Sequence, residues 1–592
     1  MGSKSQPKSA GVLAHADGTG ASSEGAPVEV ERGIVLTWAG RSEARISIPK
    51  PRVLELVQEH SDVTDDDPGN LLIEGDNRQA MVSLLPQFAG KVDVVLIDPP
   101  YNTGKNDFRY SDARFHDADA DTRKGAYVSA EDGGRHAKWL NQMAPTLRIL
   151  KDLMAPHGVI FVHINDIELP RLLLLMEEIF GEQNRAGTLV WKSATDNNPS
   201  RIVVEHEYVV VWTRDKDANQ TPWRGQIERR RQMLVDEWAR LLEEHAGLTD
   251  RRQAWFDFLA ANKKVLGSFA TNYRHVDERG AFMTSDLSFP GGGGPSYDVP
   301  HPQTGKATRV PPHGYRVSQA RMTEYLADGR VHFGKDEASS VLYKRYIFDV
   351  EDDPLRGLIT EFGGKGVNAT IKRLFPENPD IFPNPKPVEL EEFLLSFVTS
   401  RDAIVLDCFA GSGTTGHAVM RLNQKDGGTR RFVLIEEGNE ADRYATTATG
   451  ERLKRARTAE SLPGGFTFYR VGPKIDIDAF ELLQHQHVVS SILQTDASGR
   501  GGGIKQVDGQ RYVIGYNAKR EAICVFYDPK THAPVSRDVL REMFLEVDAL
   551  KLARPVRVYG ESCEVFGSES FRFFKIPDEI LNNLSVSLGN AG

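Results

Sequence analysis

The chain has 592 residues, of which 40% are hydrophobic, and its formal net charge at pH 7 is −10. This length allows several packed domains, and the acidic total argues against indiscriminate binding to nucleic acid, although it leaves room for a local basic groove. The cysteines Cys408, Cys524 and Cys563 form no CxxC pair and no zinc spacing, so we expect no structural metal and a reducing, cytoplasmic setting. No run of about 18 apolar residues occurs, so we expect no membrane span.

The first 32 residues are rich in Gly, Ser and Ala and contain no apolar segment of the kind that a signal peptide needs. We expect residues 1–32 to be a disordered tail. Residues 33–215 follow a different pattern, in which short apolar runs alternate with helical stretches. The runs are Leu71–Ile73, Val92–Ile97 and Gly158–Ile164. Continuous runs of this kind are typical of strands covered on both faces by helices, so the pattern predicts an α/β sheet.

Residues 216–380 break this rhythm. An amphipathic helix around Trp238 is followed by a long stretch rich in Gly, Pro and His. Irregular chain on this scale usually forms a loop-rich, functional insertion. The strand and helix pattern returns over residues 381–462. Residues 463–592 then form a further α+β domain, which is rich in strand patterns and carries no catalytic motif.

The tetrapeptide Asp98-Pro99-Pro100-Tyr101 stands at the end of a predicted strand, where α/β proteins place their ligands. The two prolines remove two N–H donors and leave carbonyl acceptors. The exocyclic amine of a base offers two N–H donors, one for the Asp98 carboxylate and one for a proline carbonyl. This pairing would leave the amine lone pair free for an electrophile, and Tyr101 offers a flat face for stacking on the base. The alternative is a Pro-Pro turn in which Asp98 caps a helix.

A glycine-rich turn, DCFAGSGTTG, runs from Asp407 to Gly416 between a predicted strand and a predicted helix. Gly411 and Gly413 would let the backbone approach a ligand closely. An acidic residue at the end of the next strand can hold ribose hydroxyls, and Glu436 is so placed. A turn of this kind is a weak signal by itself, because it also occurs as a tight strand-to-helix connection or in a dinucleotide site.

Together the two motifs resemble those of the amino-methyltransferases that modify DNA on adenine N6 or cytosine N4. Their order, with the tetrapeptide first and an insertion between the motifs, is that of the β group of this family. More specifically, the chain resembles the modification subunit of type III restriction systems over roughly residues 33–460. The segments that carry the resemblance are Ile97–Gly104, Gly158–Ile164, Glu205–Tyr208, Tyr297–Gly314 and Asn384–Pro387.

The resemblance implies a Rossmann-like methyltransferase sheet, S-adenosylmethionine as the methyl donor with no metal required, and double-stranded DNA as the substrate. It implies roles for particular residues. The catalytic residues would be Asp98, Pro99, Pro100 and Tyr101, and the residues that place the target would be Asn102 and Thr103. The residues around the methionine part of the donor would be Asp407, Phe409, Gly411, Gly413 and Thr414. Lys386 would lie near the donor carboxylate, Glu436 at the ribose, and Asp76 with Asn77 beside the adenine. The neighbouring acid Glu437 leaves the ribose ligand open between the two glutamates.

Several alternatives stay open at this point. Cytosine N4 methylation uses the same chemistry, although Ser-Pro-Pro-Tyr is more usual there, so Asp98 favours adenine. An RNA methyltransferase and a catalytically silent DNA-binding module are further alternatives, which the intact motifs disfavour. We expect residues 216–380 to recognise the target sequence and residues 463–592 to be an interface or a DNA clamp. We also expect a homodimer, since the apolar stripe around Trp238 would bury against another surface, and a restriction or other defence subunit as a partner.

Overall fold

The structure is a computed structural model. It describes residues 36–42, 48–64, 68–105, 108–115, 117–121, 124–193, 202–219, 223, 229–266, 269–349, 354–363, 369–382, 385–437, 443–475, 483–496, 504–507, 509–528, 530–566 and 568–589. One compact unit runs from Trp38 to Gly592. The tail predicted over residues 1–32 lies outside the described residues. Within the described residues, no helix is long and apolar enough to cross a membrane.

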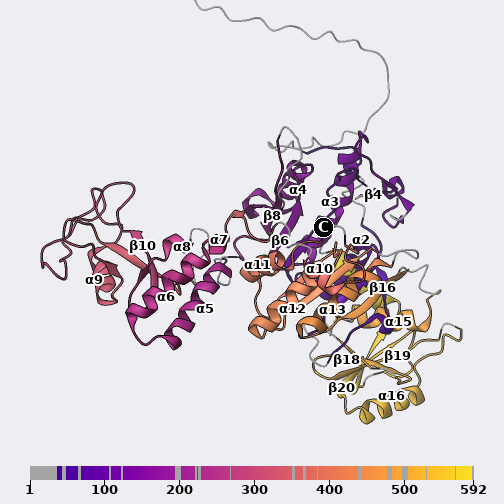
Figure 1. The fold of residues 1–592 in the computed structure, drawn as a ribbon. Coiled ribbons are helices and arrows are strands. Elements are labelled where there is room, and N and C mark those ends of the chain that lie inside the picture. The colour runs from indigo at the N-terminus through magenta and orange to yellow at the C-terminus, as the bar shows by residue number, and fades with distance from the viewer. Residues whose placement is uncertain are drawn as a thin grey trace, which may run out of the picture. The chain divides into compact units, whose positions relative to one another are not determined.

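Ten strands of the described chain form the main sheet, in the order β1-β16-β2-β15-β14-β3-β6-β8-β7-β13. Figure 1 labels β16, β6 and β8 of this sheet. The strands are, in that order, Arg52–Leu56, Thr467–Lys474, Leu71–Glu74, Arg431–Glu436, Ile404–Asp407, Val92–Ile97, Met154–Ile164, Glu207–Thr213, Arg185–Trp191 and Leu358–Ile359. The run from β16 to β6 is parallel, and β8 is antiparallel to both of its neighbours. The predicted Rossmann-like α/β sheet is therefore confirmed.

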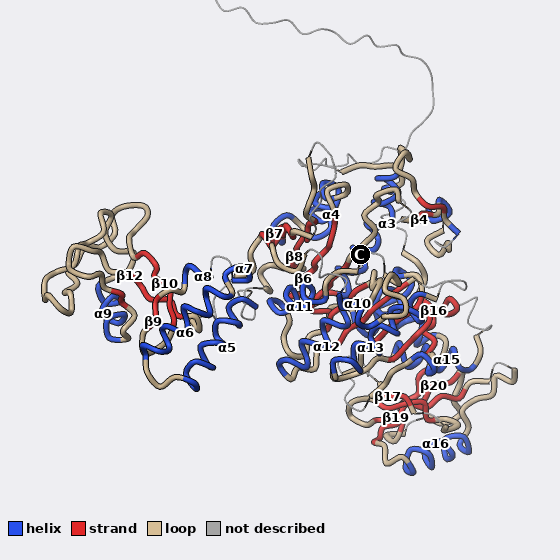
Figure 2. The backbone as a smooth tube through the Cα atoms, in the orientation of Figure 1, coloured by secondary structure: helices blue, strands red, loops and turns tan. Residues whose placement is uncertain are grey.

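Helices cover both faces of this sheet, which is why its central strands are mostly apolar. In β3, Val94, Val95 and Leu96 are all buried although their side chains alternate between the two faces. The helices that accompany the parallel strands are α2 (Asn77–Phe88), α3 (Arg135–Leu153), α4 (Leu169–Phe180), α11 (Val388–Val398), α12 (Thr414–Asp426) and α13 (Glu451–Glu460). Figure 2 shows these helices flanking the strands.

The central strands β14 and β3 lie side by side and parallel, with Val405 opposite Val94 and Leu406 opposite Val95. From β14 the chain continues through α12 to β15 on one side, whereas from β3 it continues through α3 to β6 on the other. The crossovers thus diverge between β14 and β3, and such a switch point is where open α/β sheets bind their ligands. Asp98 and Asp407 both stand at the carboxyl ends of these strands.

The insertion has its own sheet, β11-β12-β10-β9, formed by Val331–His332, Leu342–Tyr346, Ala281–Asp286 and His275–Val276. Its helices are α5 (Arg229–Glu244), α6 (Leu248–Ala261), α7 (Lys263–Leu266), α8 (Phe269–Asn272) and α9 (Gln319–Ala327). The apolar stripe of α5 packs inside the insertion, where the Trp238 ring meets the Trp255 ring edge-on at 5.7 Å between centroids. Trp238 is only 3% exposed, so the expectation that this stripe buries against another chain is wrong.

The insertion is shorter as a structural unit than the predicted range of 216–380. Strand β13 (Leu358–Ile359) pairs with β7 in the main sheet, and α10 (Ala369–Leu374) buries Ile371 and Leu374 in the core beneath that sheet. The separate sheet and apolar clusters of the insertion end before residue 350. A strand of two residues gives almost no sequence pattern, which is why the boundary was placed too late.

The last domain begins later than the predicted residue 463, because β16 (Thr467–Lys474) belongs to the main sheet. Beyond it, five strands of the described chain pair in the order β17-β18-β19-β20-β21, formed by Lys505–Gln506, Val513–Tyr516, Glu521–Phe526, Ala553–Gly560 and Phe571–Lys575. Alternate residues of β19 face opposite sides: Ile523 packs with the cluster of α15 (His485–Thr495), and Cys524 with that of α16 (Arg537–Ala549). Helix α17 (Asp578–Gly589) ends the described chain.

Candidate active site

A cavity of about 390 Å³ lies at the carboxyl ends of β3 and β14. This volume is within the usual range of ligand pockets, about 300–1,000 Å³. The cavity brings together the acceptor motif, the glycine-rich turn and the segment around Lys386, which are far apart in the sequence. Its walls are Leu96, Ile97, Asp98, His163, Phe382, Pro385, Lys386, Glu391, Asp407, Phe409, Ala410, Gly411, Ser412, Thr414, Thr415 and Tyr444.

Asp98 offers one free carboxylate oxygen at this cavity. Its Oδ2 accepts a hydrogen bond from Lys386 Nζ at 2.6 Å, whereas its Oδ1 is buried and has no hydrogen-bond partner in the described chain. Burial alone would raise the pKa of Asp98, but the charges of Lys386 and His163 hold that pKa below its usual value. Asp98 is therefore an ionised acceptor with one unused oxygen.

The two proline carbonyls of the motif differ. Trp139 Nε1, on α3, donates a hydrogen bond to the Pro100 oxygen at 2.7 Å, and the Trp139 ring is fully buried. The Pro99 carbonyl accepts no hydrogen bond from the described residues. The indole thus fixes the Pro-Pro backbone through Pro100 and leaves the Pro99 carbonyl available as an acceptor.

Tyr101 is held by the start of β8. Its hydroxyl donates to Glu207 Oε2 at 2.8 Å, and Lys386 Nζ lies 5.0 Å from the centre of its ring. Burial, followed by the charges of Asp98 and Glu207, raises the pKa of Tyr101 well above its usual value, so the phenol stays neutral and its ring orientation is fixed. Glu207 belongs to the segment Glu205–Tyr208, which resembles the family, but the sequence analysis predicts no role for it.

Lys386, predicted to lie near the donor carboxylate, lines the cavity. Its ammonium bridges Asp98 Oδ2, at 2.6 Å, and Glu207 Oε2, at 3.4 Å. Burial alone would lower the pKa of Lys386, but Asp98 and Glu207 raise it, so the side chain stays charged. The two carboxylates already compensate this buried cation, and its charge serves the acceptor motif.

Asn102 and Thr103, the predicted target-binding residues, are both engaged within the chain. Asn102 is fully buried with φ of 57°, and its Nδ2 donates to Glu168 Oε1 at 2.6 Å and to the Arg135 carbonyl at 3.2 Å. Thr103 Oγ1 accepts from the backbone N–H of Lys105 at 3.3 Å. Asn102 thus anchors the chain that leaves the catalytic tetrapeptide.

The glycine-rich turn is shaped by Asp407. Its Oδ1 accepts from the Phe409 N–H at 3.0 Å, and its Oδ2 accepts from the Thr415 hydroxyl at 2.6 Å. Gly413, at φ of 76°, is the N-cap of α12 in a left-handed conformation that favours glycine. Burial raises the pKa of Asp407 to about 7.

Of the two neighbouring glutamates, Glu436 faces the turn. Its Oε2 accepts from the Gly411 N–H at 2.6 Å, whereas Glu437 is exposed. Burial raises the pKa of Glu436 to about 8. Glu436 thus contacts the turn, although neither Glu436 nor Gly413 lines the cavity itself.

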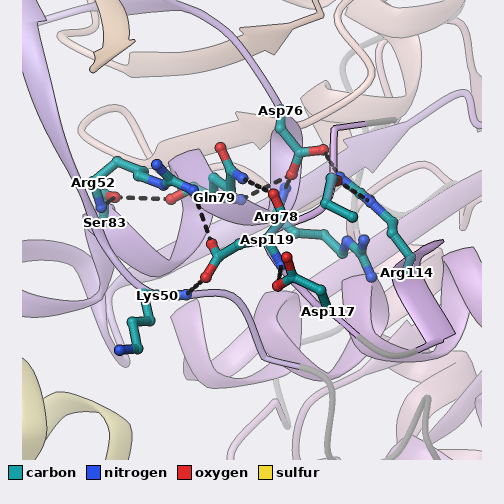
Figure 3. A network of polar contacts seen from close by, with 10 residues as sticks. Lys50, Arg52, Asp76, Arg78, Gln79, Ser83, Arg114, Asp117 and Asp119 are labelled. Atoms are coloured by element: carbon teal, nitrogen blue, oxygen red, sulfur yellow. Dashed lines mark hydrogen bonds and ion pairs between the residues drawn. The ribbon is translucent and has the colours of Figure 1, made fainter. Parts of the chain in front are cut away.

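Asp76 and Asn77 lie beside the turn without lining the cavity. Asp76 caps α2 by accepting from the Arg78 and Gln79 N–H groups, each at 3.1 Å, and it pairs with Arg114 (Figure 3). Asn77 Nδ2 donates to the Cys408 carbonyl at 3.3 Å. Asn77 therefore contacts the turn directly, and Asp76 fixes the start of the helix that carries Asn77.

Sequence reasoning missed two polar residues of the cavity. His163 lies against Glu391 with Nε2–Oε1 at 3.2 Å, and both residues line the cavity. Burial opposes protonation of His163, but the Glu391 carboxylate outweighs it and raises its pKa. No local pattern could have paired them, because they come from β6 and α11.

A model of the N6 and N4 methyltransferases, described as DNA methylase, matches residues 92–447. The chain belongs to this DNA methylase family. The Mod subunit of the type III restriction-modification enzyme EcoP15I of Escherichia coli is 33% identical to this methylase over 479 residues, which cover 76% of the chain and 73% of that protein. The StyLTI Mod subunit of Salmonella typhimurium is 27% identical over 500 residues, covering 78% and 71%. The methylase thus also belongs with the type III Mod subunits.

A solved structure, the M1.HpyAVI–SAM complex, is 14% identical to the methylase and covers 66% of this chain and all of that one. Its TM-score of 0.27 is too low for an argument about the fold. The fold assignment therefore depends on the strand order and on the two motifs at the switch point of the sheet.

Proposed function

We propose that this DNA methyltransferase transfers a methyl group from S-adenosylmethionine to the N6 amine of an adenine in double-stranded DNA. The observation that carries this proposal is Asp98, an ionised acceptor at the cavity whose buried Oδ1 has no hydrogen-bond partner in the described chain. The Pro99 carbonyl, which follows directly in the chain, accepts no hydrogen bond from the described residues either. An exocyclic amine has two N–H donors, which match two adjacent acceptors. Leaving either acceptor buried and unpaired would cost about 1–3 kcal/mol, so the site favours a ligand that satisfies both.

The cavity fits S-adenosylmethionine. The glycine-rich turn allows close approach of the ligand, Glu436 stands at the end of β15 for the ribose hydroxyls, and the acidic walls suit the positive charges of the donor. When bound, the donor supplies an electrophilic methyl group on a sulfonium. Asp407, Phe409 and Gly411 would hold its methionine part, and Asn77 would lie at the adenine end.

The chain's own residues then prepare the amine. Asp98 and Pro99 accept its two N–H groups and draw the nitrogen lone pair out of conjugation, and Tyr101 stacks on the base. Transfer is direct, without a covalent enzyme intermediate, because the acceptor motif contains no cysteine and burial raises the pKa of the nearby Cys408 thiol well above its usual value. Positioning of the two reactants supplies several kcal/mol of the rate enhancement.

Cytosine N4 is the second candidate, since its amine offers the same two donors. Asp98 favours adenine through the family pattern in which Ser-Pro-Pro-Tyr accompanies cytosine N4. In either case the target amine is out of reach inside a stacked duplex, so the base must flip out of the helix. The insertion would recognise the target sequence, because the main sheet is occupied by the donor and acceptor sites.

The similarity to type III Mod subunits suggests which system the methylase works in and which partners it has. The methylase would be the modification subunit of a restriction-modification system, with a restriction subunit as partner and with two copies of the chain acting together. The dimer rests on the family alone, because the Trp238 stripe packs within the insertion. Light scattering with and without DNA tests it, and a mass equal to one chain in both conditions would remove the dimer.

The function is tested by Asp98→Ala and Asp98→Asn with a radiolabelled methyl donor and duplex DNA. Both variants should lose methyl transfer, because neither offers an ionised carboxylate to the amine, while donor binding measured by calorimetry stays close to wild type. An exposed carboxylate of similar size, in Asp217→Asn, is the control. Normal turnover in the Asp98→Ala variant would overturn the assignment.

A further inference from the structure

A buried arginine lies directly behind the donor cavity. Arg452, on α13, is 1% exposed, and its Nη1 donates to Ser412 Oγ at 2.5 Å, to Thr414 Oγ1 at 2.7 Å and to the Ser412 carbonyl at 3.3 Å. Ser412 and Thr414 are walls of the cavity, whereas Arg452 is not. The guanidinium therefore reaches the cavity only through the two hydroxyl groups.

Arg452 forms no ion pair with any carboxylate in the described part of the chain; Glu389 and Glu460 act on it only from a longer distance. Its neighbour Arg421 is different, because it pairs with Glu389 at 3.0 Å and with Glu460 at 2.7 Å. Burial lowers the pKa of Arg452 to about 10, which still leaves it charged at neutral pH. A buried charge without a close counter-ion is costly unless a ligand of opposite charge compensates it.

The hydrogen-bond directions show where that charge acts. Because both hydroxyl oxygens accept from Arg452, their own protons must point elsewhere. Thr414 Oγ1 donates to the Lys386 carbonyl at 3.4 Å and lies 3.0 Å from Ser412 Oγ, where either hydroxyl can be the donor. A ligand carboxylate at the cavity can take either proton in place of these acceptors. The N-terminus of α12 starts here with no side-chain cap, and its free N–H groups add to the positive potential.

S-adenosylmethionine carries one negative group, the carboxylate of its methionine part. Lys386 also lines the cavity, but Asp98 and Glu207 already compensate the charge of its ammonium. We infer that Arg452 is a positioning residue for the methyl donor: it acts through Ser412 and Thr414 and supplies the charge that binds the donor carboxylate at the start of α12. This inference rests on S-adenosylmethionine being the donor.

The test compares S-adenosylmethionine with decarboxylated S-adenosylmethionine, which keeps the ammonium and the sulfonium but lacks the carboxylate. Calorimetry on the full chain gives the affinity for each ligand. Wild type should prefer the carboxylated form, and Arg452→Gln should lose about tenfold to hundredfold in affinity for it, as expected for charge-assisted hydrogen bonds, with little change for the decarboxylated form. Arg452→Lys, which keeps the charge, should restore most of the preference.

Two further variants keep the inference testable. Ser412→Ala, with Arg452 intact, should also reduce the preference for the carboxylated ligand, which gives a result even where Arg452→Gln does not fold. Arg421→Gln is the matched control, because it removes a paired cation from the same neighbourhood and should leave the preference unchanged.

Equal losses for both ligands in Arg452→Gln, or an unchanged preference in Ser412→Ala, would overturn the inference and make Arg452 only a structural link between α13 and the turn. A wild-type chain that binds neither ligand would instead contradict the proposed donor. The two failures are therefore distinguishable in one set of titrations.

Discussion

Replacing Lys386 with Met should change both the rate of methyl transfer and its dependence on pH. Methionine keeps the length and the apolar packing but removes the charge that bridges Asp98 and Glu207. Breaking a fully buried ion pair costs about 3–5 kcal/mol, whereas an exposed pair contributes about 0–1 kcal/mol. The Lys386 side chain is 12% exposed and that of Asp98 33% exposed. We therefore expect the free energy of unfolding to fall by an intermediate amount, about 1.5–3 kcal/mol. The kcat/KM at pH 7 should also fall, roughly tenfold to hundredfold, because the ammonium no longer orients Asp98 and keeps it ionised.

The sign of the pH effect follows from Asp98. In wild type the charge of Lys386 keeps the pKa of Asp98 below its usual value, so this carboxylate is ionised throughout the neutral range. Without Lys386, burial is opposed only by the charge of His163 and by the Tyr101 hydroxyl, and the pKa of Asp98 rises. The kcat/KM of Lys386→Met should then increase with pH until Asp98 is ionised, relative to wild type in the same buffers.

Steady-state kinetics with duplex DNA from pH 6 to 9 measure this profile. Lys386→Arg should keep most of the activity, because it keeps the charge. Lys192→Gln is the matched control, since it breaks a more exposed pair with Glu205, 3.3 Å apart, near the same end of the sheet. A Lys386→Met variant with the wild-type profile and rate would refute the view that this ammonium controls Asp98.

Three further predictions concern other parts of the site. Trp139→Phe removes the donor to the Pro100 carbonyl and should lower the free energy of unfolding by about 1–3 kcal/mol, with a lower kcat; unchanged urea unfolding and kcat would contradict the role of this hydrogen bond. Burial raises the pKa of Asp407 to about 7 and that of Glu436 to about 8. A cationic donor favours the ionised acids and lowers both pKa values, so binding should release protons and donor affinity should increase from pH 6 to 8. Calorimetry in buffers of different ionisation enthalpy measures this release, and proton uptake would be the opposite result. A 2-aminopurine at the target position should brighten on binding if the base flips; constant fluorescence in an active complex would argue against flipping.

The two motifs and the class of fold could be predicted from the sequence. Asp98 and Asp407 each follow a short apolar strand, and such local patterns predict the carboxyl end of a strand without knowledge of its neighbours. The pairing of β3 with β14 was not visible, because strand order depends on contacts between segments about 300 residues apart. The family resemblance supplied that juxtaposition.

The contacts that could not be predicted from the sequence are those between side chains that lie far apart in the chain. The ion pair between Lys386 and Glu207 was not predicted, because Glu207 comes from a distant strand and only the folded chain brings the two side chains together. The stripe around Trp238 was assigned to an interface, since an amphipathic helix looks the same whether α6 or another protein covers it. The sequence does not indicate a role for Arg452, because a buried arginine and an exposed arginine in a polar helix have the same sequence pattern.

The central claim, methylation of adenine N6, is tested most directly by mass spectrometry of nucleosides. DNA from cells that express the wild-type chain is digested and compared with DNA from cells that express Asp98→Ala at the same level. We predict N6-methyladenine in the first sample and its absence from the second. N4-methylcytosine in place of N6-methyladenine would contradict the assignment of the base, and the same methylated adenine in both samples would contradict the role of Asp98.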